Sequence, residues 1–523
     1  MAKKLLFTLL VVLGLLGGAE LVLRVLMPDL EQVVSPLLYQ RNSGQAFTKA
    51  KAPGTRRYVA GRGRTVTDKK AGVRILVFGA SAAYGEMFSP LTAFPGQAET
   101  LLRRANPDRP VEVLNLAHGG MGSRQVGEMA FRALENDNPD LIVVYTGNNE
   151  YHELRALKAR SDRYDPAAEL MRRRLSKSYL YRTLRETLMP AADTLTPPDD
   201  ETWLPIGRLD VTVDEKDRAL GVALYREHLR NIVLAAQARG VPVLLTTVAT
   251  NSRDHMDNAT PGEPEQSERD ALHALEGLAG ATDKSRFKET VGTRIEAIKT
   301  EGGWHRLGNL FLRAGLPEAA ADAFERKELA ALRPMTSNRH MRRVVKELGA
   351  TTGTSVCDLS ASLAASAEHG ISGQGQFIDH CHPNADGHRV LGQALAACIT
   401  DMGIGGLRGR ATLSADAQPF RVDSYSGHRK IPGFKTNPVR PDTTTAEGAA
   451  LAGHQAFVME RYPAAIAHYE LALSQGGDPA GVHHAIGLAA MYADDLARAR
   501  RELSLAAEAG NAEAAAALLP LNP

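Results

Sequence analysis

Five short runs of apolar residues, rich in Val, Ile and Leu, recur along the chain between longer segments of mixed polarity. The runs span residues 73–78, 111–114, 141–145, 241–248 and 355–359. Runs of this length and composition predict buried strands. A stretch between them, residues 225–234, has the pattern of a helix. Strands that alternate with helices predict an α/β fold, in which a parallel, doubly wound sheet carries helices on both faces.

A serine with the surroundings of a nucleophile follows the first of these strands. Ser81 lies within the sequence G-A-S-A-A-Y-G at residues 79–85, in a turn that leads to a helix expected to begin near Leu91. This is the carboxyl end of a strand, where open α/β sheets bind their ligands. A hydroxyl needs a base before it becomes a good nucleophile. A serine at this position can also simply cap a helix, so the catalytic interpretation requires a base elsewhere in the chain.

The sequence D-H-C-H at residues 379–382 supplies a candidate base. Asp379 precedes His382 by three residues, so one tight loop can present the imidazole while the carboxylate holds its tautomer. A metal cluster is the alternative, because His380 and His388 lie close to this pair in the sequence. No second group of ligands with matching spacing occurs elsewhere in the sequence. We therefore expect neither a metal nor an organic cofactor.

Two further loops can supply donors to the oxyanion that forms during acyl chemistry. The loop after Asn115 contains Gly120 and ends at Ser123, which is expected to cap the next helix. Asn149 follows the third strand, and its side-chain amide can donate a hydrogen bond without adding charge. The glycines could equally form a tight turn, and Asn149 could equally stabilise one. The functional interpretation requires these groups to meet Ser81 at the same edge of one sheet.

Taken in order, these four blocks resemble those of the SGNH hydrolases, also called the GDSL-type esterase and lipase superfamily. The serine, glycine, asparagine and Asp/His positions of the family fall on Ser81, Gly120, Asn149, Asp379 and His382. The resemblance implies that Ser81 is the nucleophile, that His382 is the base and that Asp379 orients it. It also implies an oxyanion hole formed by Ser81, Gly120 and Asn149, and a flavodoxin-like strand order.

The resemblance covers residues 70–150, 240–250 and 350–400, and the stretches between them are expected to be insertions. Two positions depart from the family pattern, because Ala80 and Glu150 stand where the family has Asp. Neither position carries the chemistry in the family. The departures therefore weaken the assignment to a subfamily but are expected to leave catalysis intact.

The amino terminus predicts export. Lys3 and Lys4 precede an uncharged apolar run of fifteen residues, which Glu20 interrupts. Lysines before an apolar segment favour a cytoplasmic amino terminus, and a run of this length is typical of a signal sequence. We expect residues 1–27 to act as a retained signal anchor. The catalytic domain is then on the extracytoplasmic face of the membrane, which is the periplasmic side in a Gram-negative cell.

Composition narrows the functional classes. The chain has 523 residues, which predicts two or three domains, and its net charge of +2 points to no particular partner. It has no basic helix interleaved with aromatic residues, so nucleic-acid binding is not expected. The three cysteines make no disulfide framework, and their odd number leaves at least one unpaired. Cys381, inside the D-H-C-H block, is expected to be a small packing residue.

Small residues recur at an interval of 34 near the carboxyl end, as in the pairs Gly453/Gly487 and Ala465/Ala499. This interval is the period of the tetratricopeptide repeat. A unit at residues 301–334 has the W-x2-L-G-x2-F and A-x3-F spacing that resembles the same repeat. Such repeats could bind a protein partner or pack on the hydrolase domain. Plain helical hairpins are the alternative, since two terminal repeats are fewer than such arrays usually need.

The chain is thus divided into a hydrolase domain and helical additions. The hydrolase domain spans residues 70–405 with insertions at 151–215 and 253–345, followed by a linker at 406–445 and tetratricopeptide-like repeats at 446–515. The first insertion is crowded with Arg and Lys between residues 155 and 185. Such a run is usually a solvated helix face, but it could also cover the active site or face anionic lipid headgroups.

The function predicted from the sequence is that of an exported serine esterase or lipase. It would hydrolyse an acyl ester of a lipid or of an acylated glycan through a covalent acyl-enzyme. One alternative is an O-acyltransferase or deacetylase that uses the same residues on a cell-envelope polysaccharide. Another is a repeat scaffold whose hydrolase domain only binds a ligand.

Overall fold

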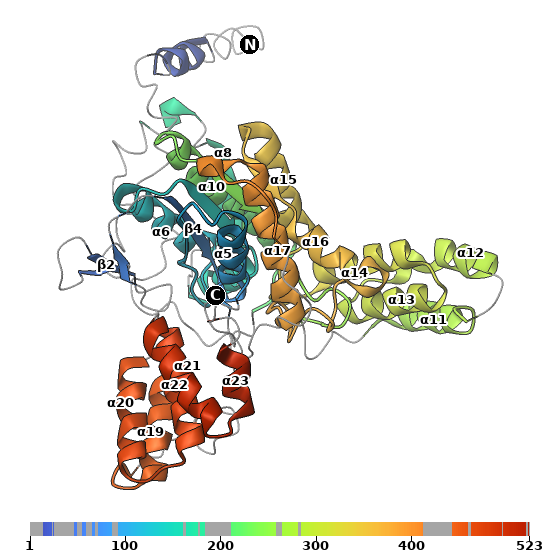
Figure 1. Cartoon of the computed structure of the whole chain (residues 1–523). Helices are drawn as coiled ribbons and strands as arrows, with labels where there is room; N and C mark the ends of the chain where they lie inside the picture. Colours follow the sequence, from blue (N-terminus) through green and yellow to red (C-terminus); the bar gives the residue numbers. More distant parts are fainter. Residues whose placement is uncertain are drawn as a thin grey trace, which may run out of the picture.

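A parallel sheet of five strands lies at the centre of the chain (Figure 1). The computed structural model describes residues 14–23, 25, 47–49, 55–58, 65–67, 69, 72–85, 93–160, 164–175, 178–181, 183, 211–257, 264–280, 284–411, 442–458, 462–493, 495–518 and 521. The sheet contains β4 (Val73–Gly79), β5 (Val111–Asn115), β6 (Leu141–Tyr145), β7 (Val243–Thr246) and β8 (Ser355–Cys357). The five runs expected to be strands are therefore confirmed.

All neighbouring strands of this sheet are parallel, and their spatial order is β5-β4-β6-β7-β8. This is the flavodoxin-like order, in which the chain reverses direction across the sheet after its first two strands. The reversal leaves a crevice at the carboxyl ends of β4 and β6, and ligands of such sheets bind there. The doubly wound parallel sheet is confirmed, and the order is the one implied by the resemblance.

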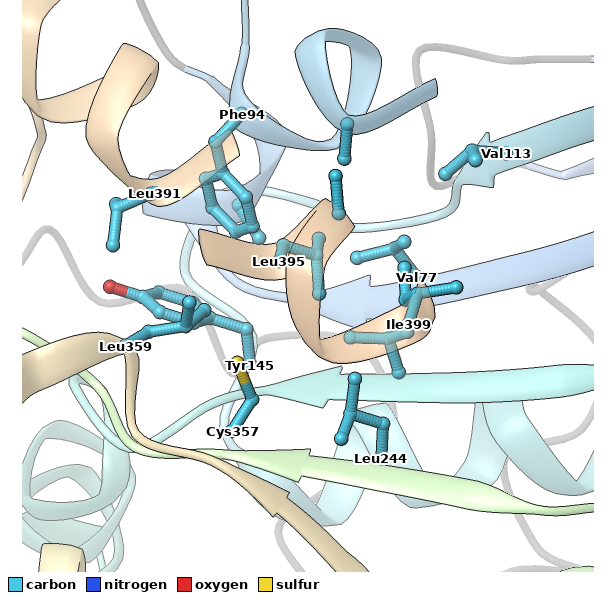
Figure 2. Close-up of a cluster of buried hydrophobic side chains, with 14 of the residues drawn as sticks. Val77, Phe94, Val113, Tyr145, Leu244, Cys357, Leu359, Leu391, Leu395 and Ile399 are labelled. Carbon is cyan, nitrogen blue, oxygen red and sulfur yellow. The ribbon is translucent and has the colours of Figure 1, made fainter. Parts of the chain in front are cut away.

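Helices cover both faces of the sheet because side chains alternate between the faces along each strand. One face packs on α5 (Phe94–Ala105), α16 (Leu359–Ala365) and α17 (Ala385–Asp401), and Figure 2 shows part of this core. The other face packs on α6 (Ser123–Asn136), α10 (Glu215–Gln237) and α15 (Arg339–Thr352). The first insertion forms α7 (Glu150–Arg160) and α8 (Pro166–Leu175), and both helices contact α10.

The described part of the amino-terminal region contains elements that the sequence pattern did not predict. Three short strands, β1 (Phe47–Lys49), β2 (Thr55–Tyr58) and β3 (Thr65–Thr67), form a separate antiparallel sheet. Residues 14–23 are helical, and the rest of the expected anchor at residues 1–27 lies almost wholly outside the described residues. Within the described part of the chain, no helix has both the length and the hydropathy needed to cross a membrane.

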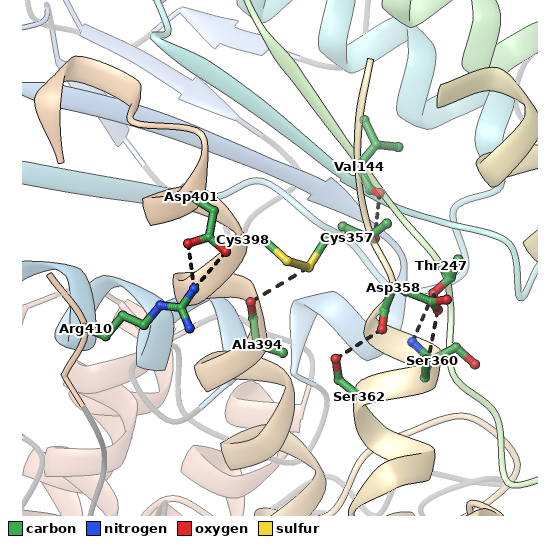
Figure 3. The surroundings of a disulfide bond; sticks show 12 residues. Val144, Thr247, Cys357, Asp358, Ser360, Ser362, Ala394, Cys398, Asp401 and Arg410 are labelled. Atoms are coloured by element: carbon green, nitrogen blue, oxygen red, sulfur yellow. Dashed lines mark hydrogen bonds and ion pairs between the residues drawn. A yellow bond between two sulfur atoms is a disulfide. The ribbon is translucent and has the colours of Figure 1, made fainter. Parts of the chain in front are cut away.

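A disulfide between Cys357 and Cys398 joins the edge strand β8 to α17 (Figure 3). The sequence analysis did not foresee this pairing, because it depends on α17 lying against β8 in the folded sheet. Cys381 is buried and unpaired, in agreement with the expectation of at least one free cysteine. The disulfide encloses residues 379–382, so it restrains both ends of the segment that carries the candidate base.

The second insertion is a group of helices that extends away from the sheet in Figure 1. It contains α11 (Gln266–Glu276), α12 (Lys284–Arg294), α13 (Glu301–Arg313) and α14 (Pro317–Ala330). The helices α13 and α14 form a tight hairpin, in which a Cβ atom at Gly308 would lie 2.7 Å from the ring of Phe324. A side chain at position 308 would therefore push the two helices apart.

The carboxyl-terminal helices have their own core and repeat the same contact. They are α19 (Ala446–Val458), α20 (Tyr462–Ser474), α21 (Pro479–Tyr492), α22 (Leu496–Glu508) and α23 (Ala512–Leu518). Gly453 packs against Tyr469, and Gly487 packs against Leu503, at the same sequence separation as Gly308 and Phe324. In each of these three hairpins, a glycine on the first helix thus packs against a large side chain on the second helix. Most of the expected linker, residues 412–441, lies outside the described residues.

The hairpin of α13 and α14 is bonded to the loop that follows β7. Lys327 Nζ donates to the carbonyl oxygen of Ser252 at 2.8 Å. The Glu328 carboxylate accepts from the hydroxyls of Thr250 and Ser252 at 2.9 and 2.6 Å. Lys327 and Glu328 are both buried, so these bonds are shielded from water and hold the β7 loop in place.

We expect Trp304→Ala to destabilise the catalytic domain as well as the hairpin. Trp304 is buried in the insertion core, and Arg326 lies 5.0 Å from the centre of its ring. Truncation of a buried Trp costs about 3 kcal/mol or more of unfolding free energy. The melting temperature should therefore fall, and so should the ester hydrolysis that the sequence analysis predicts. Arg313→Ala, at an exposed position of the same helix, is the control. A Trp304→Ala protein with the melting temperature of the control would show that the insertion is not part of the cooperative fold.

Candidate active site

Ser81 is the first residue of a short helix, α4 (Ser81–Tyr84), which begins directly after β4. Ala80 occupies the N-cap position without a side-chain hydrogen bond, so the capping interpretation of Ser81 is wrong. The next helix, α5, begins at Phe94 rather than near Leu91. The first backbone N–H groups of a helix have no partner within it. The Ser81 N–H is therefore placed where it can donate to a bound group.

Gly79 is required by the contact between β4 and β6. It is the register partner of Tyr145 at the end of β6. A Cβ atom at Gly79 would lie 2.4 Å from the Tyr145 carbonyl oxygen and 2.7 Å from Cβ of Ala83. Any side chain there would force the strand apart from its neighbour or from α4. This glycine thus allows the sharp turn that brings Ser81 to the carboxyl edge of the sheet.

The loop at residues 379–382 holds its histidine through Asp379. One carboxylate oxygen of Asp379, Oδ2, lies 2.6 Å from His382 Nδ1. The other, Oδ1, accepts from the backbone N–H groups of Cys381 and His382 at 3.0 and 2.9 Å. Burial opposes ionisation of Asp379, but His382, His380 and the backbone donors together hold its pKa below the ordinary range. Asp379 is therefore a carboxylate that fixes the ring of His382 with Nε2 facing away from it.

Further hydrogen bonds fix this loop to its surroundings. The side chain and backbone N–H groups of Asn251 donate to the carbonyl oxygens of Asp379 and His380, both at 3.0 Å. Ile378 N–H donates to the His382 carbonyl oxygen at 2.9 Å, which closes the loop on itself. The position of the loop thus depends on the β7 loop, and through it on the hairpin of α13 and α14.

Tyr145 shows that Ser81 and His382 belong to the same edge of the sheet. Its hydroxyl accepts from Ala249 N–H at 3.3 Å, across the top of β7. Burial raises the pKa of the Tyr145 phenol, and the phenol lies close enough to Cys381 and His382 for their charges to act on it. Since Gly79 is paired with Tyr145, the turn at Ser81 and the loop of His382 both lie near this residue.

The expected oxyanion residues lie on two loops that are bonded to each other. Gly120 has φ of 75°, a conformation that favours glycine. Asn149 Nδ2 donates to the carbonyl oxygen of Met121 at 3.0 Å. A carboxamide nitrogen carries two hydrogens, so this bond fixes the amide and leaves the second hydrogen for a ligand. Asn115 Nδ2 donates to the Ala83 carbonyl oxygen at 2.8 Å, which connects the Gly120 loop to α4.

A buried polar cluster behind these loops was not predicted from the sequence. Ser123 is the first residue of α6 and not its cap, since Gly122 has that position. Its Oγ lies 2.6 Å from Glu150 Oε2 and 2.9 Å from His228 Nδ1. Glu150 also accepts from the Ser123 N–H at 3.1 Å. The cluster joins the start of α6, just after Gly120, to the start of α7, just after Asn149.

Burial makes the Glu150 carboxyl harder to ionise than an exposed carboxyl. Burial raises its pKa to about 8, Glu153 adds to the effect, and the hydrogen bonds from Ser123 oppose it. The position where the resemblance has Asp thus holds a longer side chain that reaches the serine of the neighbouring loop. A sequence signal existed for Glu150, which follows Asn149 directly. None existed for His228, which lies within a long helix.

The metal alternative needs a correction, because His388 is not part of the group. His388 is fully buried and its Nδ1 accepts from the N–H of Phe94 at 3.2 Å. The ligand atoms of Asp379, His380, Cys381 and His382 do lie together, within 4.8 Å of one another. Burial opposes the thiolate of Cys381, but the imidazoles of His382 and His380 lower its pKa to about 7. Cys381 is thus buried, as expected, but in a polar environment.

No protein-family model matches the chain, and no curated protein matches it. Similar solved structures include LAE5, an alpha/beta hydrolase enzyme from the metagenome of Lake Arreo. It is 13% identical, the match covers 65% of this chain and 99% of LAE5, and the TM-score is 0.29. The acetylxylan esterase Axe2 from Geobacillus stearothermophilus has the same four values. A GDSL-like lipase from Bacteroides thetaiotaomicron is 10% identical over 63% of this chain and 88% of its own, with a TM-score of 0.28. These values do not assign the chain to a family, so its function is argued from the site.

We expect substitutions at Asn149 and Glu150 to reduce turnover by different amounts. Asn149→Ala removes the donor that the sequence analysis predicts for the oxyanion, and it should then lower kcat by about 10²–10³-fold. Glu150→Ala acts only through the position of the two loops, so its effect should be smaller. Glu150→Gln keeps a neutral side chain that can accept from Ser123, and it should restore most of the rate. Steady-state kinetics on folded protein, checked by circular dichroism, measures each effect. Equal rates for Glu150→Ala and Glu150→Gln would show that the cluster does not position the donors.

Proposed function

We propose that this chain is a serine hydrolase of the SGNH type that acts on ester bonds. The observation that carries the proposal is the pairing of Asp379 with His382 Nδ1 at 2.6 Å, in a loop held at the carboxyl edge where Ser81 begins α4. An oriented histidine beside a serine at a strand-to-helix turn is the arrangement that activates a hydroxyl. The side-chain amide of Asn149 and the Gly120 loop can stabilise the negative charge of an oxyanion.

The proposed reaction follows from the hydrogen bonds of the site. Because Asp379 engages Nδ1 of His382, Nε2 accepts the proton as Ser81 Oγ attacks the acyl carbon. The N–H groups of Ser81 and Gly120 and the Asn149 amide stabilise the oxyanion. His382 then gives its proton to the leaving alcohol, and an acyl-enzyme remains on Ser81. Water, activated by the same nitrogen, releases the acid and restores the serine.

We also propose that the chain is exported and anchored by its amino-terminal segment. The disulfide between Cys357 and Cys398 supports an oxidising compartment, where such bonds form and persist. The hairpins that share the Gly308, Gly453 and Gly487 contacts support a tetratricopeptide-like arrangement. Stacked hairpins of this kind present a surface for a protein partner or a macromolecular substrate.

Ser81→Ala should abolish covalent labelling by a fluorophosphonate probe. It should also lower the hydrolysis of a short-chain p-nitrophenyl ester by on the order of 10³-fold or more, because no nucleophile remains. Mass spectrometry of the labelled peptide identifies the modified residue. Cys381→Ala is the control and should still be labelled. Labelling of Ser81→Ala on another serine, or loss of labelling in Cys381→Ala, would contradict the assignment of the nucleophile.

The pH profile of kcat/KM should be bell-shaped. His382 must be neutral to accept a proton, so activity should rise with pH on the acidic side as the imidazole loses its proton. The Asp379 carboxyl has a lowered pKa and stays ionised through this rise. Burial raises the pKa of Glu150 to about 8, so its ionisation at higher pH should disturb the oxyanion loops and lower the rate.

The variant Glu150→Gln separates the acidic limb of the pH profile from the basic limb, because a glutamine side chain cannot ionise. Its profile should keep the rise at low pH and lose the fall at high pH. Rates measured from pH 5 to pH 10 at constant ionic strength test both limbs. A flat acidic limb in the parent protein would exclude a histidine base.

A further inference from the structure

The loop that holds the candidate base carries two groups that the proposed mechanism does not use. His380 and Cys381 lie between Asp379 and His382, and the four residues offer ligand atoms within 4.8 Å of one another. Cys381 Sγ is 3.9 Å from His382 Nδ1. His380 Nδ1 is 3.6 Å from Asp379 Oδ1. One thiol, two imidazoles and one carboxylate thus lie close enough together to be ligands of one ion.

This set of donors selects among metal ions. Thiolate and imidazole ligands suit zinc, whereas magnesium and calcium prefer oxygen ligands. Zinc binds sulfur at about 2.3 Å and nitrogen at about 2.0–2.1 Å in tetrahedral geometry. With these bond lengths and tetrahedral angles, two ligand atoms of one zinc ion lie roughly 3.3–3.7 Å apart. The separations of 3.9 and 3.6 Å are close to this range. The group as a whole extends to 4.8 Å, and Asp379 Oδ2 lies 2.6 Å from His382 Nδ1, so binding requires these side chains to rearrange around the ion.

We propose that Zn²⁺ binds reversibly to Asp379, His380, Cys381 and His382 and inhibits the hydrolase. The inhibition rests on the proposed function, while the binding site does not. On binding, the Cys381 thiol gives its proton to solvent as the zinc–sulfur bond forms. Asp379 and His382 become ligands of the same ion, so the hydrogen bond between them is replaced. The imidazole can then no longer be oriented by the carboxylate or accept the proton of Ser81.

The location of Cys381 explains why the site would regulate the enzyme rather than take part in the chemistry. Its side chain is buried against the base, and the loop is fixed by Asn251 on one side and by the closure between Ile378 and His382 on the other. The four ligands come from consecutive residues of one restrained loop, so binding needs no domain movement. An ion held there binds the His382 imidazole that the proposed mechanism needs. Zinc binding and substrate turnover therefore exclude each other.

The test uses the full chain, freed of metal with a chelator and then titrated with zinc chloride. Equilibrium dialysis with elemental analysis should find one zinc per chain, and ester hydrolysis should fall in parallel and recover on addition of EDTA. Magnesium chloride should have no effect. Cys381→Ala and His380→Gln should each weaken zinc binding by about tenfold or more, because each removes a ligand. Inhibition is expressed relative to the zinc-free rate of each variant.

His273→Ala is the matched control, since His273 is a surface histidine whose side chain is 91% exposed. It should bind zinc and be inhibited like the parent chain. The proposal is overturned if dialysis finds no stoichiometric zinc, or if both loop variants retain the affinity of the parent. Zinc-free protein that does not hydrolyse esters would contradict the proposed function, and dialysis would still decide the metal site. If Cys381→Ala does not fold, His380→Gln at a partly exposed position decides the result.

Discussion

The backbone contact between Gly79 and Tyr145 is the constraint on which the rest of this structure depends. The two residues are register partners at the carboxyl ends of β4 and β6, and no side chain fits between them. This contact lies where the strand order reverses, and the reversal opens a crevice at one edge of the sheet. The nucleophile candidate follows one side of the contact, and the Asn149 loop follows the other.

The candidate base reaches this edge by a longer route, and several interactions fix its position. The disulfide of Cys357 and Cys398 restrains the segment at both ends, and Asn251 holds the carbonyl groups of the loop. Buried Lys327 and Glu328 attach the β7 loop to an inserted hairpin. A helical insertion between β7 and β8 thus contributes to the placement of one histidine.

The polar cluster of Ser123, Glu150 and His228 serves the other half of the site. It is buried, and the Ser123 hydroxyl lies 2.6 Å from Glu150 and 2.9 Å from His228, so the cluster links the two loops. A neutral Glu150 is compatible with burial, whereas an ionised one would be costly beside Glu153. The family-like sequence G-N-N-E therefore differs from the usual pattern in a way that the packing accommodates. The difference concerns the contact between the two loops and not the side chain of Asn149.

The sequence by itself determined the parallel sheet, because five apolar runs separated by helical stretches have few other ways to bury their side chains. It also placed Ser81, Gly120, Asn149, Asp379 and His382 at strand ends or in loops, because local turn chemistry is visible in neighbouring residues; their catalytic roles stay a prediction. Only the tertiary structure decided which of the three cysteines pair, that Ser81 and Ser123 begin helices without capping them, and that His388 is buried away from the loop. It alone joined Glu150 and His228 through the hydroxyl of Ser123, and the inserted hairpin to the β7 loop. These features depend on contacts between residues that are distant in sequence. Hydrophobic periodicity indicates which residues are buried, but it does not indicate which residues they pack against.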